Sequence, residues 1–289
     1  MHIQWYPGHM TKARRTIEQM SGLCDAVLYV LDARAAGACL NPDFDRILGK
    51  KPTLFLLNKS DLADPAVTAE WIAFFRAQGR EARAVVGGDL ASKKVIAEGL
   101  KSLLKERLAR DAAKGVRRPI RAMIVGIPNC GKSTLLNSAA GQKRALTGDR
   151  PGVTRGTQWI RLAEGLELLD TPGTLWNAFS DQTVGLHLAF LGSINDDILD
   201  FEELAGELLK TLSELAPAAA QARCKVVLSG DPARDLPAVA AARGFLGKGG
   251  ALDLERCARA LVDDFRKGRM GRISLERPPR QGQPEARNP

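Results

Sequence analysis

Cysteine pairs, aromatic side chains and long apolar runs are all scarce in this chain of 289 residues. The five cysteines are odd in number and scattered, without C-x-x-C spacing, which argues against a disulfide framework or a zinc site and favours a reducing compartment. No apolar run is long enough to span a bilayer, and the N-terminal stretch MHIQWYPGHMTKARR has no apolar signal segment. It is basic, like a transit peptide, but short and interrupted by Pro7 and Gly8. We therefore expect a cytoplasmic protein without a membrane span.

The composition indicates a helix-rich α/β protein, because only 5% of the residues are aromatic and alanine and leucine are abundant. An apolar content of 45% is ample for a buried core, and the length suits one large domain or two modest ones. The formal net charge of +9 suits a polyanionic partner, although a solvated basic surface would produce the same charge.

Short apolar runs separated by helical stretches predict a mostly parallel sheet with helical crossovers. Strands are expected within residues 25–34, 52–61, 81–89, 120–128, 157–162 and 166–173, the last two joined by a hairpin, and one helix over 92–113. After Trp176 strand-like runs nearly stop, and amphipathic helices are expected within 201–217 and 253–268. This predicts an α/β domain over 1–175, a small all-α domain over 176–278 and a disordered tail over 279–289.

The stretch GIPNCGKS, residues 126–133, fits the phosphate-binding pattern G-x-x-x-x-G-K-[ST] between a predicted strand and a predicted helix. Backbone N–H groups would close on phosphate oxygens, and a side chain at Gly131 would obstruct them. Lys132 would neutralise the β- and γ-phosphates, and the Ser133 hydroxyl could bind Mg²⁺. The nucleotide-binding residues predicted here are Asn129, Cys130, Gly131, Lys132, Ser133 and Thr134. A chance glycine-rich turn is the alternative.

A second phosphate-side element is LLDTPG, residues 168–173, which ends a predicted strand with an acid. Asp170 could hold Mg²⁺ through water, and the Gly173 N–H could meet the γ-phosphate. In the preceding polar stretch 148–156, Thr154 is the candidate switch threonine, whose hydroxyl and carbonyl would reach Mg²⁺ and γ-phosphate. A lone D-x-x-G is often just a turn, so the prediction depends on the order of these elements. The predicted Mg²⁺ ligands are Ser133, Thr154 and Asp170, and Lys132 and Thr154 are predicted to be catalytic.

The stretch LLNKSDL, residues 56–62, ends an apolar run with the pattern N-K-x-D. Asp61 could accept hydrogen bonds from the N1–H and the 2-amino group of guanine, which adenine cannot supply. Asn58 would contact the other edge of the base, and the stem of Lys59 would cover its face. The predicted base-binding residues are Asn58, Lys59, Ser60 and Asp61; a polar loop after a strand is the alternative.

The order of these motifs is unusual, because in most guanine-nucleotide proteins N-K-x-D follows the phosphate-binding loop. Ligands of α/β sheets lie at the carboxyl ends of the strands however the chain threads them, so a circular permutation would keep every loop in place. The predicted fold class is therefore α/β, a circularly permuted P-loop GTPase domain with a mostly parallel sheet flanked by helices, followed by a small all-α C-terminal domain. That helical domain would follow directly on Gly173 and would move with the nucleotide state.

Several stretches together carry a family resemblance: WYPGHMTKARR (5–15), LDAR (31–34), NP (41–42), LLNKSDL (56–62), GIPNCGKSTLLN (126–137), TGDRPGVTRGTQW (147–159) and LELLDTPGTLW (166–176). With them the chain closely resembles the ribosome biogenesis GTPase A family (YlqF/RbgA), circularly permuted GTPases of large-subunit assembly. The resemblance implies GTP hydrolysis coupled to binding of the large ribosomal subunit precursor, with a helical domain that contacts its rRNA.

Two positions depart from the family pattern. Val86 and Gly87 stand where the loop after the third strand usually carries a small polar residue, so only a backbone contact to guanine is expected. Thr174 follows DTPG where the family tends to have an aliphatic residue and many GTPases have a catalytic glutamine. Threonine is too short to orient water as glutamine does, so slow unaided hydrolysis is expected.

His9 is the candidate to place the attacking water, because its basic segment could fold over the phosphates and the resemblance supports a catalytic role. A capping or RNA-facing histidine is the alternative. Asn129 resembles the asparagine of potassium-stimulated GTPases, which implies K⁺ as an activator. The candidate RNA contacts are Lys12, Arg14, Arg15, Arg266, Lys267, Arg269 and Arg272. Such contacts recognise charge and shape, and solvated surface is the alternative for each.

The predicted function is a GTPase that promotes a late step of large-subunit assembly, with GTP hydrolysis triggering release and with stimulation by the subunit. An RNA-binding scaffold with structural GTP and incidental hydrolysis is the alternative, which the missing glutamine keeps open. An ATP-dependent enzyme such as a small-molecule kinase is disfavoured by Asp61. The expected ligands are GTP or GDP and Mg²⁺, the expected partner is ribosomal RNA rather than DNA, and a monomer is expected.

Overall fold

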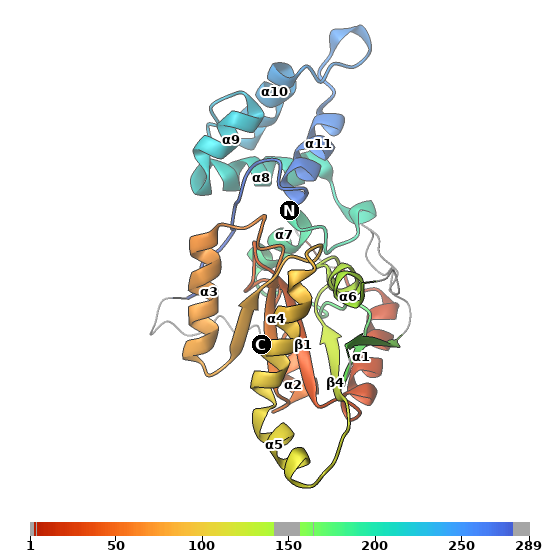
Figure 1. Cartoon of the computed structure of the whole chain (residues 1–289). Coiled ribbons are helices and arrows are strands. Elements are labelled where there is room, and N and C mark those ends of the chain that lie inside the picture. Colours follow the sequence, from red (N-terminus) through yellow and green to blue (C-terminus); the bar gives the residue numbers. More distant parts are fainter. Residues whose placement is uncertain (1–2, 4, 142–156, 164, 280–289) are drawn as a thin grey trace.

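The computed structural model describes the chain except residues 1–2, 4, 142–156, 164 and 280–289. A six-stranded sheet in the order β3-β2-β1-β4-β6-β5 organises the first part of the chain (Figure 1). Its strands are β1 Ala26–Asp32, β2 Thr53–Asn58, β3 Glu81–Ala84, β4 Ile120–Val125, β5 Gln158–Ala163 and β6 Leu166–Asp170. The β5–β6 hairpin is antiparallel and every other pairing in this sheet is parallel. The predicted α/β class is confirmed.

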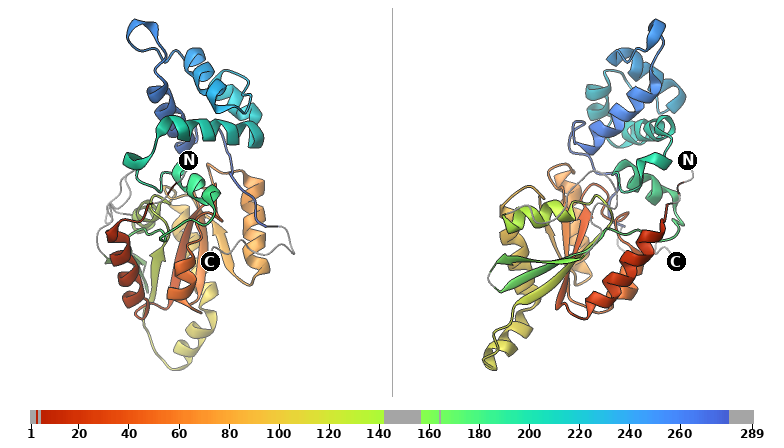
Figure 2. Two further views of the ribbon diagram at one scale, coloured as in Figure 1. Left: turned by 180° about the vertical axis from the view of Figure 1, so that it is seen from behind. Right: turned by 90° about the vertical axis from the view of Figure 1, so that its right-hand side faces the viewer.

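Helices cover both faces of the sheet, as the right view of Figure 2 shows for α1 and α6. They are α1 Gly8–Ser21, α2 Pro42–Leu48, α3 Pro65–Ala77, α4 Ala91–Leu103, α5 Lys105–Ala113 and α6 Lys132–Ala140. Successive strand residues point to opposite faces. In β2, Phe55 stacks on Phe75 of α3 with ring centroids 4.8 Å apart, whereas Leu54 lies against Gly99 of α4.

The single helix expected over 92–113 is wrong, because the structure has two helices, α4 and α5. The backbone departs from helical geometry at Leu104, where φ is −104° and ψ is 18°. No residue of α5 is buried, so no apolar stripe extends the packing of α4 onto it. Instead Arg107 fastens α5 to Asp25 at 3.0 Å and to the Pro119 carbonyl at 3.4 Å.

The helices after β6 form the upper part of the molecule in Figure 1. They are α7 Gln182–Phe190, α8 Phe201–Leu215, α9 Pro217–Cys224, α10 Pro232–Arg243 and α11 Leu254–Arg266, with short 3-10 turns at Asp196–Ile198 and Lys248–Gly250. Leu204, Leu208 and Leu212 form the buried stripe of α8, whereas Leu215 at its end is half exposed. No helix in the described part of the chain combines the length and apolar character needed to cross a bilayer.

The chain returns from the helical part to the sheet after α11. Residues 272–277, here called the C-terminal strap, lie along the loops that follow β1 and β2. Ile273 N–H donates to the Leu62 carbonyl at 3.1 Å, and Leu275 N–H donates to the Arg34 carbonyl at 2.7 Å. Glu276 accepts from Ala38 N–H at 2.9 Å. The division near residue 176 stays a prediction, but the strap ties the end of the helical part back to the sheet.

Candidate nucleotide-binding site

Three of the predicted motifs meet at one edge of the sheet. Residues 58–61, the guanine loop, follow β2; residues 126–133, the phosphate loop, follow β4; and DTPG begins at the end of β6. Neighbouring parallel strands end at the same edge, so the chain order of these motifs does not matter. Asn58 Nδ2 donates to the Cys130 carbonyl at 2.8 Å, and Lys59 Nζ donates to the Asn129 carbonyl at 2.7 Å.

The phosphate loop has the close approaches that the sequence predicts. Gly131 has φ of 92°, and a Cβ there would lie 2.3 Å from Asn58 Nδ2, so a side chain would clash. Lys132 is buried, and its Nζ donates to the Gly126 carbonyl at 3.0 Å and to the Ile127 carbonyl at 2.7 Å. The ammonium is thereby held over the loop. Ser133 and Thr134 lie in the first turn of α6, whose N-terminus favours negative charge.

Asp170 is buried at the end of β6, and within the described residues neither carboxylate oxygen has a hydrogen-bond partner. Burial raises the pKa of Asp170 to about 6, although the Lys132 ammonium and the nearby Thr171 backbone N–H lower it. A buried carboxylate without partners is costly unless a cation compensates it. Together with the Ser133 hydroxyl, Asp170 therefore fits a Mg²⁺ ion, which prefers oxygen ligands.

The DTPG loop packs directly on the phosphate loop. A Cβ at Gly173 would lie 2.8 Å from Pro128 N and 3.0 Å from Lys132 Nζ. The following Thr174 is buried, and its hydroxyl donates to the Leu175 carbonyl at 3.0 Å. That hydroxyl is thus used within the protein, in agreement with the argument that Thr174 does not orient water.

The loop after β3 approaches the guanine loop, as the sequence suggests. A Cβ at Gly87 would lie 3.3 Å from Asn58 Oδ1, and Val86 precedes it. Ser60 is tied to the same loop, because its hydroxyl donates to the Val85 carbonyl at 3.0 Å. Asp61 is exposed. A carboxylate that reads a base edge has to be accessible in this way.

Sequence reasoning missed three positioning residues around this site. Asp32 and Arg34 are fully buried, and Asp32 Oδ2 lies 3.0 Å from Lys59 Nζ. Asn41 donates through Nδ2 to the Thr174 carbonyl at 3.2 Å and so holds the backbone after DTPG. For Asp32 and Arg34 the sequence contained a signal, because LDAR places two opposite charges at the end of an otherwise apolar strand. Charges buried at such a position need a partner.

Among the described residues, the side chain of the catalytic candidate His9 makes no hydrogen bond, ion pair or ring contact with the phosphate loop. His9 lies exposed in the first turn of α1, with its ring edge-on to Trp5 at a centroid distance of 6.2 Å. Thr154 lies outside the described residues. Their catalytic roles stay predictions.

Two of the seven candidate RNA contacts, Arg266 and Arg272, bind backbone carbonyl groups of other segments. Arg266 pairs with Asp196 at 2.8 Å and donates to the carbonyls of Ala189 and Phe190. Arg272 donates to the carbonyls of Ala63 and Ser60, each at 3.0 Å. Arg266 thus joins α11 to α7 and the turn at Asp196 within the helical part, and Arg272 joins the strap to the loop after β2.

The other five candidate RNA contacts are exposed or pair with acidic side chains. Arg14 pairs with Asp43 at 3.3 Å, whereas Lys12 and Arg15 are exposed on the same helix. Lys267 and Arg269 lie just after α11, about half exposed, and both pair with Asp263.

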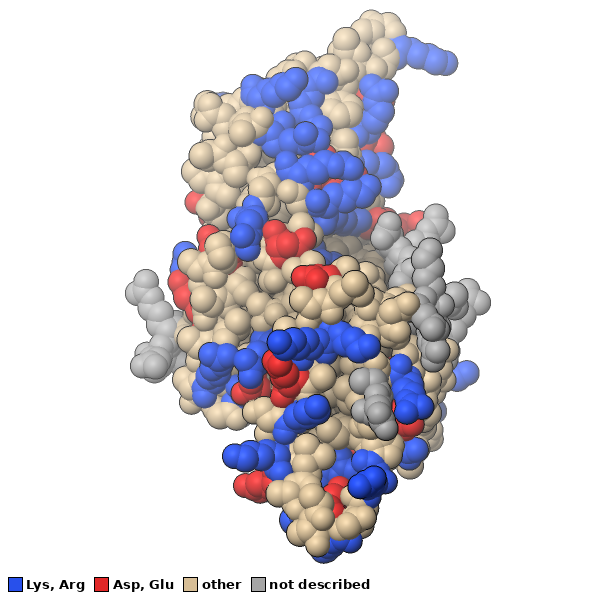
Figure 3. Space-filling view, viewed as in Figure 1, with Lys and Arg blue, Asp and Glu red and all other residues tan. Residues whose placement is uncertain are grey.

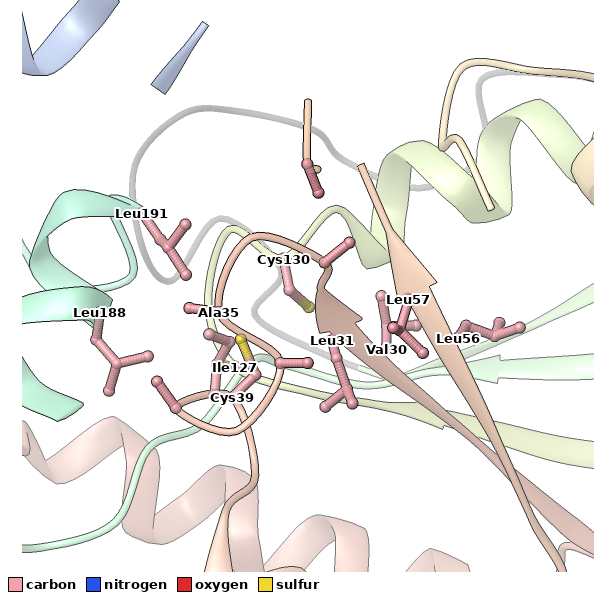
Figure 4. Close-up of a cluster of buried hydrophobic side chains, with 14 of the residues drawn as sticks. Val30, Leu31, Ala35, Cys39, Leu56, Leu57, Ile127, Cys130, Leu188 and Leu191 are labelled. Carbon is pink, nitrogen blue, oxygen red and sulfur yellow. The ribbon is translucent and has the colours of Figure 1, made fainter. Parts of the chain in front are cut away.

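The helical part also packs on the back of the phosphate loop. In Figure 4, Leu188 of α7 and Leu191 directly after it lie in one buried cluster with Ile127 and Cys130. Asn129 Nδ2 donates to the Gly192 carbonyl just after α7 at 2.6 Å. The phosphate loop is therefore in direct contact with the helices that follow DTPG.

Comparisons with known proteins agree with this geometry. Residues 121–227 match the model of a family described as 50S ribosome-binding GTPase. Ribosome biogenesis GTPase A of Priestia megaterium is 42% identical over 287 residues, covering 98% of this chain and 100% of that protein. The protein of that name from Thermotoga maritima is 33% identical over 96% of this chain and 95% of its own length. A solved GDP-bound YlqF structure covers 91% of this chain and 99% of that chain, with a TM-score of 0.68 at 29% identity.

Proposed function

The chain belongs to the ribosome biogenesis GTPase A family, and we propose that it binds the large ribosomal subunit precursor and promotes a late step of its assembly. As a member it is a GTP hydrolase of ribosome biogenesis, and in the proposal hydrolysis triggers its release from the particle. The observation that carries the proposal is the contact of α7 and Gly192 with the phosphate loop. A change at the phosphates would be passed to the helices that follow. The proposal implies a monomeric, cytoplasmic protein.

The nucleotide would lie across the guanine loop and the phosphate loop. The residues proposed to bind it are Asn58, Lys59, Ser60, Asp61, Val86, Gly87, Asn129, Cys130, Gly131, Lys132, Ser133, Thr134 and Gly173. Asp61 would accept from the N1–H and the 2-amino group of guanine, and Lys132 would exchange its carbonyl partners for phosphate oxygens.

Two cations complete the proposed site. Ser133 and Asp170, together with Thr154, would hold Mg²⁺. When bound, this ion neutralises charge on the phosphates. Asn129 would help to hold K⁺ near the same phosphates, where a further positive charge favours hydrolysis.

Hydrolysis would be slow without a partner, because Thr174 is buried and its hydroxyl is bonded within the protein. His9 is proposed to orient the attacking water once the N-terminal segment has moved over the phosphates on the ribosomal particle. Its exposed position in the first turn of α1 leaves the ring accessible for such a change.

The helical part offers the surface for ribosomal RNA. Lys and Arg side chains gather over the upper part of the molecule in Figure 3. Lys267 and Arg269 lie there with side-chain exposures of 54% and 46%. Many of the arginines on this surface pair with neighbouring acids, as Arg259 does with Glu255 at 2.6 Å, so RNA phosphates would replace carboxylates as partners. Arg266 and Arg272 would keep their internal roles.

The switch proposal is tested by GTP hydrolysis in K⁺ buffer, with and without purified large subunits, and with Na⁺ as the control. We expect a low intrinsic rate, strong stimulation by the subunit, higher rates in K⁺ than in Na⁺, and loss of the stimulation in His9→Ala. A low rate that subunits leave unchanged, despite tight GTP binding, would instead favour an RNA-binding scaffold with structural GTP.

Base reading is tested separately with Asp61→Asn. An amide at this position would donate toward the C2 carbonyl of xanthine but would repel the 2-amino group of guanine. GDP affinity should fall at least about a hundredfold, and that of xanthosine diphosphate should rise, in equilibrium titrations. The matched control is Asp45→Asn, which removes the same charge from an exposed position on α2. Equal GDP affinity of the two variants would contradict the assignment of the guanine loop.

A further inference from the structure

The buried pair Asp32–Arg34 lies at the end of β1, beside the guanine loop. Arg34 donates from Nε to Asp32 Oδ1 at 2.9 Å and from Nη2 to Asp32 Oδ2 at 2.8 Å. Both side chains are 1% exposed. A bidentate pair of this kind fixes the orientation of the carboxylate as well as its charge.

The carboxylate of Asp32 holds the lysine of the guanine loop. Its Oδ2 lies 3.0 Å from Lys59 Nζ, and the Ala33 N–H donates to the Asn58 carbonyl at 2.8 Å. Lys59 has a positive φ of 56°, which few residues other than glycine adopt. The contact with Asp32 therefore holds Lys59 in a strained turn. It also fixes the aliphatic stem of Lys59, which would cover the face of guanine.

The far side of Arg34 is bound to the end of the last helix. Nη1 donates to the carbonyls of Phe265 at 3.1 Å and Arg266 at 3.2 Å, in the last turn of α11. These carbonyls form the negative end of the helix, which favours a cation. The backbone of Arg34 also accepts from Leu275 of the strap at 2.7 Å. One buried side chain thus joins Asp32 to a helix more than two hundred residues away in the sequence.

The strap adds a second contact to the guanine loop. Arg272 donates from Nη2 to the Ser60 carbonyl and from Nε to the Ala63 carbonyl, each at 3.0 Å. The side chains of Ile273 and Leu275, which alternate with the polar residues of the strap, are buried. Their burial fixes the position of the strap along the loops after β1 and β2.

We propose that Arg34 and Arg272 are positioning residues for guanine-nucleotide binding, Arg34 through Asp32 on Lys59 and Arg272 on the Ser60 carbonyl. The inference rests on the proposed assignment of residues 58–61 as the guanine loop. Arg34 binds the end of α11 and Arg272 belongs to the strap, so a shift of the C-terminal segment would also shift the guanine loop. A ligand that shifts α11 changes nucleotide affinity, and nucleotide changes the affinity for that ligand by the same factor.

A double-mutant cycle on GDP affinity tests the route through Asp32. Lys59→Met keeps the apolar stem but removes the ammonium, and Arg34→Lys keeps a charge but cannot reach both Asp32 and the α11 carbonyls. Each single variant should raise the Kd for GDP about tenfold, the size of a lost charged hydrogen bond. The double variant should have the same Kd for GDP as Lys59→Met. Arg34 acts through the Asp32–Lys59 contact, and Lys59→Met already removes that contact. Additive effects of the two changes would overturn the route through Asp32.

The strap contact is tested with a matched pair of variants that leave the core intact. Arg272→Ala removes the contact to the Ser60 carbonyl. Arg277→Ala removes an exposed arginine five residues further on, which pairs with Glu70 of α3 instead. The Kd for GDP should rise about fivefold in Arg272→Ala and stay unchanged in Arg277→Ala, because only the first contact reaches the guanine loop. Equal values for the two variants would overturn the role of Arg272. This pair also decides the proposal if Arg34→Lys does not fold.

The outcome with Asp61→Asn separates this inference from the proposed function. If Asp61→Asn loses GDP selectivity while the cycle is additive and Arg272→Ala binds normally, the base-reading site is right and the positioning role is wrong. If Asp61→Asn keeps full GDP affinity, the assignment of the guanine loop fails first.

Discussion

Replacing Asp170 by asparagine should stabilise the protein when metal and nucleotide are absent. Asp170 is buried at the end of β6, and burial raises its pKa from 3.8 to about 6. A shift of that size corresponds to about 3 kcal/mol between the two protonation states. The folded protein therefore keeps this proton to a higher pH than the unfolded chain does, and the free energy of unfolding falls as the pH rises from about 4 to 6.

At pH 7.5 Asp170 is ionised and buried in the metal-free protein, which lowers the free energy of unfolding. A neutral amide at this position has no such effect. We expect Asp170→Asn to raise the free energy of unfolding by up to about 3 kcal/mol at pH 7.5 and by little at pH 4. Urea unfolding with EDTA and without nucleotide measures both values. Mg²⁺ with GDP should stabilise the natural protein more than the variant, and the variant should lose GTP hydrolysis.

A matched control is Asp45→Asn, an exposed position where the same change should leave stability nearly unaltered at both pH values. Asp170→Asn could leave the free energy of unfolding unchanged at pH 7.5, or raise it equally at pH 4 and pH 7.5. Either result would show that the Asp170 carboxylate is not a buried charge that a cation compensates. The reasoning on the Mg²⁺ site would then be refuted.

Three other variants separate the site from the scaffold. Gly131→Ala should lower GDP affinity more than about tenfold in titrations, because a Cβ would lie 2.3 Å from Asn58 Nδ2 at a positive φ; unchanged affinity would contradict the loop geometry. Asp264→Ala should destabilise the helical part by about 3 kcal/mol in urea unfolding, since it leaves the surrounding arginines without their buried carboxylate; a loss below about 1 kcal/mol would show that solvent screens them. Phe75→Ala should cost about 3–5 kcal/mol by removing the ring stacked on Phe55, with the Kd for GDP unchanged in the folded protein.

The positions of the motifs at the ends of predicted strands were sufficient to predict the α/β class and to bring the guanine and phosphate loops to one edge of the sheet. The apolar runs ending at Asp32, Asn58 and Asp170 read as strands, and a loop that follows a parallel strand lies at the same edge as its neighbours. For that reason the guanine and phosphate loops could be assigned to one site although they come in permuted order. The need for glycine at 131 was likewise predictable from the loop motif, whereas the close approach of Asn58 to this position was not.

Long-range contacts were beyond the reach of the sequence. Arg266 and Arg272 read as surface cations because their charge and neighbours are those of an RNA-binding segment, yet both donate to carbonyls of other elements. The break at Leu104 was also missed, because the contacts of Arg107 with Asp25 and the Pro119 carbonyl are made outside the helix.

The sequence by itself determined the local elements and the chemistry of the loops, because backbone conformation, capping and apolar periodicity act between near neighbours in the chain. Only the tertiary structure decided that α7 packs on the phosphate loop, that the strap returns to the guanine loop, and that Arg34 joins Asp32 to α11. Each of these contacts joins residues far apart in the sequence, and packing the two parts together both buries apolar side chains and leaves buried polar groups that must be satisfied.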